Sequence, residues 1–193
     1  HSWENISTLL VMPYLVLNPR TKLVSSIRYA GKLKRSLMQW IVKLIVHGWS
    51  CAIVSNSRQG LVVENLLGSK KGNVIYNGID LLPFDTYKLI VSQFLEFKNR
   101  VIMVGRFYGA KDYITFIDAA KLVLEKNANT CFVCVGDGAN RLAAEDAAGE
   151  YLNKTIFFIG ERNDIPALLR EMTIGVLLNN TNGHAEGISN SIM

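Results

Sequence analysis

Apolar and polar positions along the second half of the chain form blocks that predict strands and helices in turn. Short apolar runs that end at a glycine or a polar loop are typical of buried parallel strands. Four such runs occur, at 101–104, 131–135, 155–159 and 174–178. Stretches with helical spacing of apolar residues follow the first three, at 115–124, at 141–152 and from Asp164 onward. This alternation predicts a parallel sheet in a doubly wound α/β domain.

Acidic residues stand at the expected starts of two of these helices. Asp112 precedes the 115–124 stretch and puts a negative charge near its amino end, where the helix dipole favours one. Asp164 stands before Ile165-Pro166, which is the pattern of a capping residue with a proline in the first turn. We therefore expect Asp164 to cap the helix that follows it.

The first half of the chain repeats the strand–helix pattern less regularly. Strand candidates lie at 22–27, 51–55 and 74–76, and a helix is expected at 33–47. A mixed segment that begins at Pro83 separates the two halves. We predict two Rossmann-like units, each incomplete, with residues 1–82 in the first, 83–98 as the linker and 99–193 in the second.

Composition supports a folded protein with two different halves. The chain is 49% hydrophobic and 19% charged, which favours a packed core over disorder. Residues 1–98 carry 12 Lys/Arg and 5 Asp/Glu, whereas residues 99–193 carry 9 and 11, so the halves are expected to meet different partners. No apolar run approaches the 18 residues of a spanning helix. The opening residue His1 and the interrupted helix start at 188–193 predict a protein truncated at both ends.

The three cysteines, Cys51, Cys131 and Cys134, make an odd set that favours a reducing compartment over disulfide pairing. The spacing of Cys131 and Cys134 matches a redox or zinc pair. Within a strand, however, residues three apart point to opposite faces of the sheet. We expect both to be buried core thiols.

Candidate chemistry gathers in the loops that follow the four strands of the second half. Ligands of such sheets bind at the carboxyl ends of the strands, where loops lead into helix amino termini. The loops are 105–112, 136–138, 160–164 and 179–190. Cations beside glycine in two of them, together with a polar helix start in the last, predict a cradle for a diphosphate. Gly136-Asp137-Gly138 suits a tight turn equally well.

Six short segments carry a resemblance to a known family when they are taken in order. They are Val54-Ser55-Asn56-Ser57 with Gly60, Val74 to Asp80, Val104-Gly105-Arg106 with Lys111, Val135 to Gly138, Phe158-Ile159-Gly160, and Glu186 to Met193. In this order the chain resembles the retaining, nucleotide-sugar-dependent glycosyltransferases of family 4, which have the GT-B fold. The last segment is similar to the opening of that family's Glu-x7-Glu motif, whose second glutamate would follow Met193.

The resemblance implies an enzyme that moves a sugar from a nucleoside diphosphate to an acceptor hydroxyl with retention of configuration, in polysaccharide or glycolipid synthesis. The implied catalytic residues are Arg106, Lys111 and Glu186. The implied donor-binding residues are Gly105, Gly136, Gly138, Gly160, Arg162, Gly187, Ile188, Ser189 and Asn190. No metal or other cofactor is expected, because the chain lacks an Asp-x-Asp pair. A GT-B-like sugar-nucleotide epimerase and a non-catalytic nucleotide-sugar binding module are the alternatives.

On the acceptor side the sequence departs from the family. Arg28 stands where many members place a histidine after a strand, and it could meet a phosphate or carboxylate; His1 could border the same cleft. The 31–50 segment mixes basic and apolar residues, as an interfacial helix at an anionic membrane does. We favour a helix that packs on its own sheet and exposes its basic face to solvent. The expected location is cytoplasmic, with the inner membrane face as an option, and the 193 residues alone are expected to be inactive.

Overall fold

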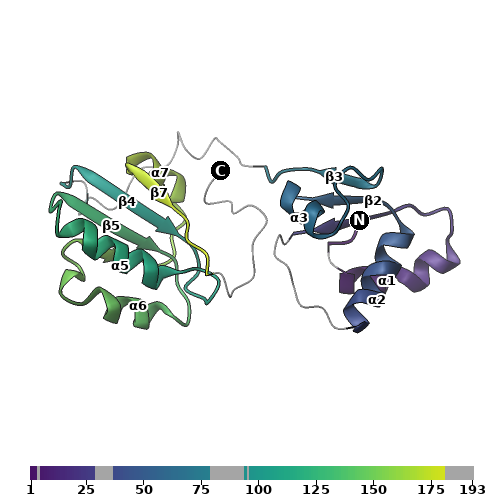
Figure 1. The fold of residues 1–193 in the computed structure, drawn as a ribbon, viewed down its shortest axis with the longest axis horizontal. Helices are drawn as coiled ribbons and strands as arrows, with labels where there is room; N and C mark the ends of the chain where they lie inside the picture. The colour runs from purple at the N-terminus through teal and green to yellow at the C-terminus, as the bar shows by residue number, and fades with distance from the viewer. Residues whose placement is uncertain (4, 29–36, 79–93, 95, 181–193) are drawn as a thin grey trace. The chain divides into compact units, whose positions relative to one another are not determined.

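The computed structural model describes residues 1–3, 5–28, 37–78, 94 and 96–180 (Figure 1). These residues fall into two compact units, within His1–Gly78 and Ile79–Gly183, and each unit is described by itself. The predicted linker at 83–98 lies mainly outside the described residues, so its boundaries stay predictions. Phe94 and Phe97, near its end, pack in the core of the second unit.

The first unit is a three-stranded parallel sheet with one helix before its first strand and one helix between each pair of successive strands. The strands are β1 (Leu23–Ile27), β2 (Ser50–Ser55) and β3 (Gly72–Val74), in the order β1-β2-β3. The helices are α1 (Asn5–Leu17), α2 (Leu37–Trp49) and α3 (Arg58–Val63). The first two predicted strands are confirmed. The third lies at 72–74 and not at the predicted 74–76. At its start Gly72 passes close to Leu66, whose carbonyl oxygen an added Cβ would overlap.

Helix α2 differs from the helix favoured by the sequence. Among its described side chains only Val46 is buried. The ammonium of Lys43 is not solvated, because it lies 2.6 Å from the Glu64 carboxylate, which is almost fully buried. The exposed large side chains of α2 are instead apolar: Leu37, Met38, Trp40, Ile41, Leu44, Ile45 and Trp49. The expected solvent-exposed basic face is therefore wrong for the described part of this helix. Lys32, Lys34 and Arg35 lie outside the described residues.

The second unit is a four-stranded parallel sheet in the order β6-β5-β4-β7. The strands are β4 (Asn99–Val104), β5 (Thr130–Val135), β6 (Ile156–Phe158) and β7 (Ile174–Val176). The helices are α5 (Tyr113–Leu124), α6 (Arg141–Ala148) and α7 (Ile165–Glu171), with a 3₁₀ turn η1 at Gly149–Tyr151. β5 and β6 lie on one side of β4, and β7 lies on the other side. This is the predicted doubly wound pattern, and the order reverses between β4 and β7.

The core of the second unit has two layers, one on each face of the sheet. One cluster joins α5 and α6 to the sheet, and the other joins α7 and Phe94 to the opposite face. Cys134 lies in the first cluster and Cys131 in the second, and both are fully buried. The predicted buried thiols on opposite faces are confirmed. Burial raises the pKa of Cys131 to about 11, and it raises the pKa of Cys134 as well.

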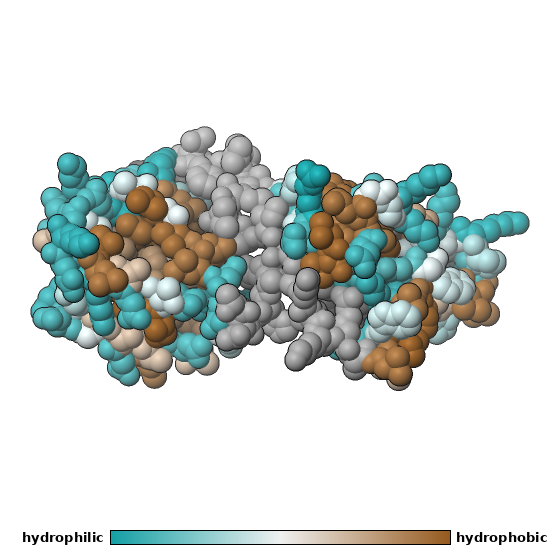
Figure 2. Space-filling view, viewed as in Figure 1, coloured by the Kyte–Doolittle hydropathy of each residue, from teal (hydrophilic) through white to brown (hydrophobic). Residues whose placement is uncertain are grey.

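Among the described residues, no helix combines the length and the apolar content that a membrane-spanning segment requires. The largest apolar exposure of the first unit lies on α1 and α2, and it is visible as brown surface over these helices (Figure 2).

Candidate functional site

The reversal of strand order in the second unit places two loops beside each other at the carboxyl edge of the sheet. β4 pairs with β7 from Val101–Ile174 to Met103–Val176. Beyond the strands, the two chain segments stay joined: the Asp112 amide donates to the Leu178 carbonyl at 3.1 Å, and the Asn180 amide donates to the Ala110 carbonyl at 3.0 Å. Doubly wound sheets bind their ligands at this kind of position.

Two predicted cations come from the loop after β4. Arg106 is exposed. Lys111 is half-buried, and its ammonium donates to the Asn179 side-chain oxygen at 3.1 Å. The side-chain amide of Asn179 therefore fixes Lys111 at the reversal point. The structure places both cations on one loop at the edge where an anion would bind.

Glycines bring the neighbouring loops into direct backbone contact. Gly136 has φ +130°, and a Cβ there would lie 1.9 Å from the Gly105 carbonyl oxygen. Gly138 has φ +151°, and its Cβ would lie 2.7 Å from the Phe107 carbonyl oxygen. The Gly136 amide donates to the Gly160 carbonyl at 2.8 Å, which extends the contact to the loop after β6. The tight-turn interpretation of Gly136 and Gly138 thus has a clear steric basis, and their donor contact stays a prediction.

Tyr113, at the start of α5, contacts the ends of β4 and β5 at this edge. The sequence pattern did not predict this role. The ring of Tyr113 stacks on Phe107 with the centroids 3.8 Å apart. Its hydroxyl lies 3.0 Å from the Gly105 carbonyl oxygen and 2.9 Å from that of Val135. Burial raises the pKa of Tyr113, so it stays a neutral donor to the loop backbone. Asp112 lies at the amino end of α5 as predicted and also caps the helix, because its carboxylate accepts from the Thr115 amide at 3.0 Å.

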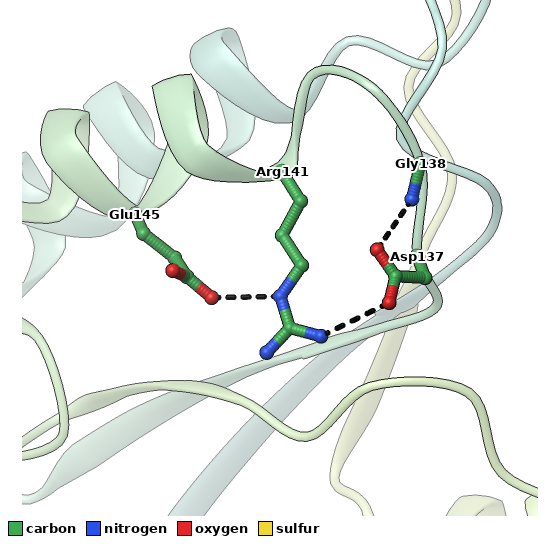
Figure 3. A network of polar contacts seen from close by, with 4 residues as sticks. All are labelled: Asp137, Gly138, Arg141 and Glu145. Carbon is green, nitrogen blue, oxygen red and sulfur yellow. Dashed lines mark hydrogen bonds and ion pairs between the residues drawn. The ribbon is translucent and has the colours of Figure 1, made fainter.

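A polar network at the carboxyl end of β5 was also missed (Figure 3). Arg141 donates to the Glu145 carboxylate at 2.7 Å and lies 3.4 Å from the Asp137 carboxylate. Asp137 in turn accepts from the Gly138 amide at 2.7 Å. The hydrogen bond to Glu145 is the main reason that the pKa of Arg141 is raised. The i,i+4 spacing of these three charges is the sequence signal that could have found the network.

The loop after β6 contains a correction. Asp164 stands at the start of α7, but its side chain forms no capping hydrogen bond. It pairs instead with Arg162 through two contacts, at 2.7 Å and 2.5 Å. The pair lowers the pKa of Asp164 and raises that of Arg162. The Arg162 side chain is 18% exposed, and its predicted contact with the base stays a prediction.

Five predicted residues lie outside the described part of the chain: Glu186, Gly187, Ile188, Ser189 and Asn190. Their roles stay predictions. Within the described residues, no group of three His, Cys, Asp or Glu side chains is arranged to hold a metal ion. The expectation that no metal is needed remains a prediction.

The acceptor-side candidates meet at the carboxyl end of β1 in the first unit. His1 Nε2 lies 2.7 Å from the Ser26 hydroxyl oxygen. The guanidinium carbon of Arg28 lies 4.1 Å from the ring centre of Trp3, and His1 and Trp3 have their ring centres 6.0 Å apart. Sequence reasoning proposed His1 and Arg28 but missed Trp3, which lies beside both.

The fold of the chain is similar to the GT-B fold of solved glycosyltransferases. The structure of HepE from Anabaena in complex with UDP superposes with a TM-score of 0.70 at 16% identity, over 90% of this chain and 51% of that one. Residues 98–193 match the model of the family described as Glycosyl transferases group 1. The predicted GT-B architecture is confirmed.

Two curated relatives are similar in sequence. The UDP-Gal:alpha-D-GlcNAc-diphosphoundecaprenol alpha-1,3-galactosyltransferase of Escherichia coli is 34% identical over 128 residues, which are 60% of this chain and 33% of the relative. The Vi polysaccharide biosynthesis protein VipC/TviE of Salmonella typhi is 27% identical over 126 residues, which are 61% of this chain and 22% of the relative. The chain thus spans a third or less of the length of these relatives.

Proposed function

We propose that this chain is part of a retaining GT-B glycosyltransferase of family 4, which moves a sugar from a nucleoside diphosphate to an acceptor hydroxyl. The β4–β7 edge carries this proposal, because Arg106 and Lys111 lie on one loop at the reversal of a sheet whose segment matches glycosyltransferases group 1. The UDP complex of HepE and the galactosyltransferase name of the E. coli relative support a UDP-sugar as the donor.

In the proposed mechanism Arg106 and Lys111 bind the donor diphosphate and stabilise the charge that develops on the leaving group. Fixed cations are most effective when they need no rearrangement, and the hydrogen bond from Lys111 to Asn179 supplies such fixation. Glu186 would orient the donor sugar, and the amides of residues 188–190 would bind phosphate at a helix start. Arg162 would stack on the base. No step requires a metal ion.

The proposed acceptor is a glycan or a lipid-linked sugar, as the names of the two relatives suggest. We extend the proposal to peripheral contact with the cytoplasmic face of a membrane through α2. The exposed Trp40, Ile41 and Leu44 support it, because an interfacial helix buries such side chains among lipid headgroups. Co-sedimentation of the complete protein with anionic vesicles should fall in a Trp40→Ser, Leu44→Ser variant and be low with zwitterionic vesicles. Equal binding of both proteins would refute the contact.

The function itself is tested with the complete protein and a panel of UDP-sugars. We expect UDP release together with a glycosylated lipid-linked acceptor whose anomeric configuration matches that of the donor. An inverted product would refute retention. Conversion of the sugar nucleotide without an acceptor would identify an epimerase, and tight donor binding without turnover would identify a binding module.

A further inference from the structure

Arg28 and Trp3 form a stacked pair at the carboxyl end of β1. The guanidinium carbon lies 4.1 Å from the ring centre, well within the range of about 6 Å for a cation–π contact. Trp3 is 53% exposed and Arg28 is exposed as well. Within the described part of the chain, Arg28 forms no ion pair. Stacking uses one face of the guanidinium, so its N–H edge remains available for an anion.

The pair is held in place by the residues around it. The Ser2 amide donates to the Val24 carbonyl at 2.9 Å, which aligns residues 1–3 with β1. The Ser2 and Thr8 hydroxyls form a buried hydrogen bond of 2.6 Å. These contacts fix Trp3 beside the strand end, so Arg28 does not need to be ordered when a ligand binds.

The neighbouring strand adds an acceptor at the same edge. Ile27 pairs with Ser55, and the next residues along the two strands are Arg28 and Asn56. The side-chain oxygen of Asn56 is buried and has no hydrogen-bond partner among the described residues. Native structures seldom leave such an oxygen unpaired. Because this oxygen is buried, the group at this edge that can meet an anion is Arg28.

We propose that this edge is a site for the diphosphate of a sugar-diphosphate acceptor, with Arg28 binding the anion. The site rests on the proposed function, under which the donor diphosphate binds at Arg106 and Lys111 of the other unit. We assign this second anion site to the acceptor. The planar fork of arginine forms two parallel hydrogen bonds with phosphate oxygens, which a histidine does not.

The test compares two synthetic acceptors that differ only in the linkage: one sugar joined to a short alkyl chain through a diphosphate, and the same sugar as a plain alkyl glycoside. Binding to the complete protein is measured by calorimetry without donor. Arg28→Ala should weaken binding of the diphosphate compound about tenfold or more and leave the glycoside unchanged. The affinity of Arg28→Lys for the diphosphate compound should lie between those of Arg28→Ala and the unmodified protein. Arg20→Ala is the matched control, because Arg20 is exposed and lies before β1, at its other end.

An equal loss of affinity for both compounds in Arg28→Ala, or no loss for either, would overturn the proposed site. Weaker binding of UDP with unchanged acceptor binding would also overturn it, by assigning Arg28 to the donor. Transfer assays run in parallel separate the two proposals. Arg28-dependent binding without sugar transfer would refute the function and leave the site, whereas transfer with an unchanged KM for the diphosphate acceptor in Arg28→Ala would refute the site alone.

Discussion

The two sheets of this protein end in edges that are built in different ways. In the second unit, the loops after β4, β5 and β6 touch through their backbones, with Gly136 and Gly138 at the contacts. In the first unit, the edge is formed by side chains: His1 bonds to Ser26, and Arg28 stacks on Trp3. A backbone-built edge tolerates little change, whereas a side-chain edge can vary without disturbing the sheet.

The strongest test of the backbone-built edge is Gly136→Ala. The added Cβ would overlap the Gly105 carbonyl at a backbone angle that alanine rarely adopts, so we expect a loss of about 3 kcal/mol or more in the free energy of unfolding of the second unit. Gly149→Ala is the control. It has φ +56° and ψ −128°, which residues with a side chain rarely adopt, but open space around the added Cβ, so its cost should be about 1–3 kcal/mol and come from backbone strain alone. Similar losses in denaturant unfolding would show that steric contact between the loops is unimportant.

A smaller effect is expected at the loop after β6 in the second unit, where Arg162 and Asp164 form an ion pair. Asp164→Asn removes the charge partner of Arg162 and should lower the free energy of unfolding by about 1–3 kcal/mol at pH 7. Because pairing depresses the pKa of Asp164, this contribution is present above the unfolded carboxyl pKa of about 3.9 and is lost as pH falls below it. Unfolding curves of the two proteins should therefore converge in acid. A difference that is constant with pH would contradict the pair's role.

The smallest expected effect is on the chemical labelling of the cysteine thiols, whose reactivity depends on how deeply each one is buried. Cys51 in the first unit is exposed, whereas Cys131 and Cys134 are buried. With a pKa of about 11, roughly one Cys131 thiol in a thousand is ionised at pH 8. A maleimide should thus label Cys51 within minutes and leave the other two intact, as read by mass spectrometry of peptides. Rapid labelling of Cys131 would show that the second unit opens.

The contrast between the edges also explains what the sequence could predict. Apolar runs ending at glycine revealed the strands and the loop glycines of the second unit, because strand burial and tight turns depend on local residue type. The roles of Tyr113 and Trp3 could not be predicted, because the residues that they contact are distant in sequence and are brought near only by the fold. Asp164 was assigned to a cap because the local pattern does not show that Arg162, two residues away, competes for its carboxylate.

Donor binding tests the central claim most directly. Calorimetry of UDP with the complete protein should show affinity that falls about tenfold or more in Lys111→Ala, because a fixed cation that pairs with a diphosphate is lost. Lys126→Ala, an exposed lysine just beyond the other end of α5, should bind UDP as the unmodified protein does. Equal affinity of all three proteins for UDP would contradict a donor site at the β4–β7 edge.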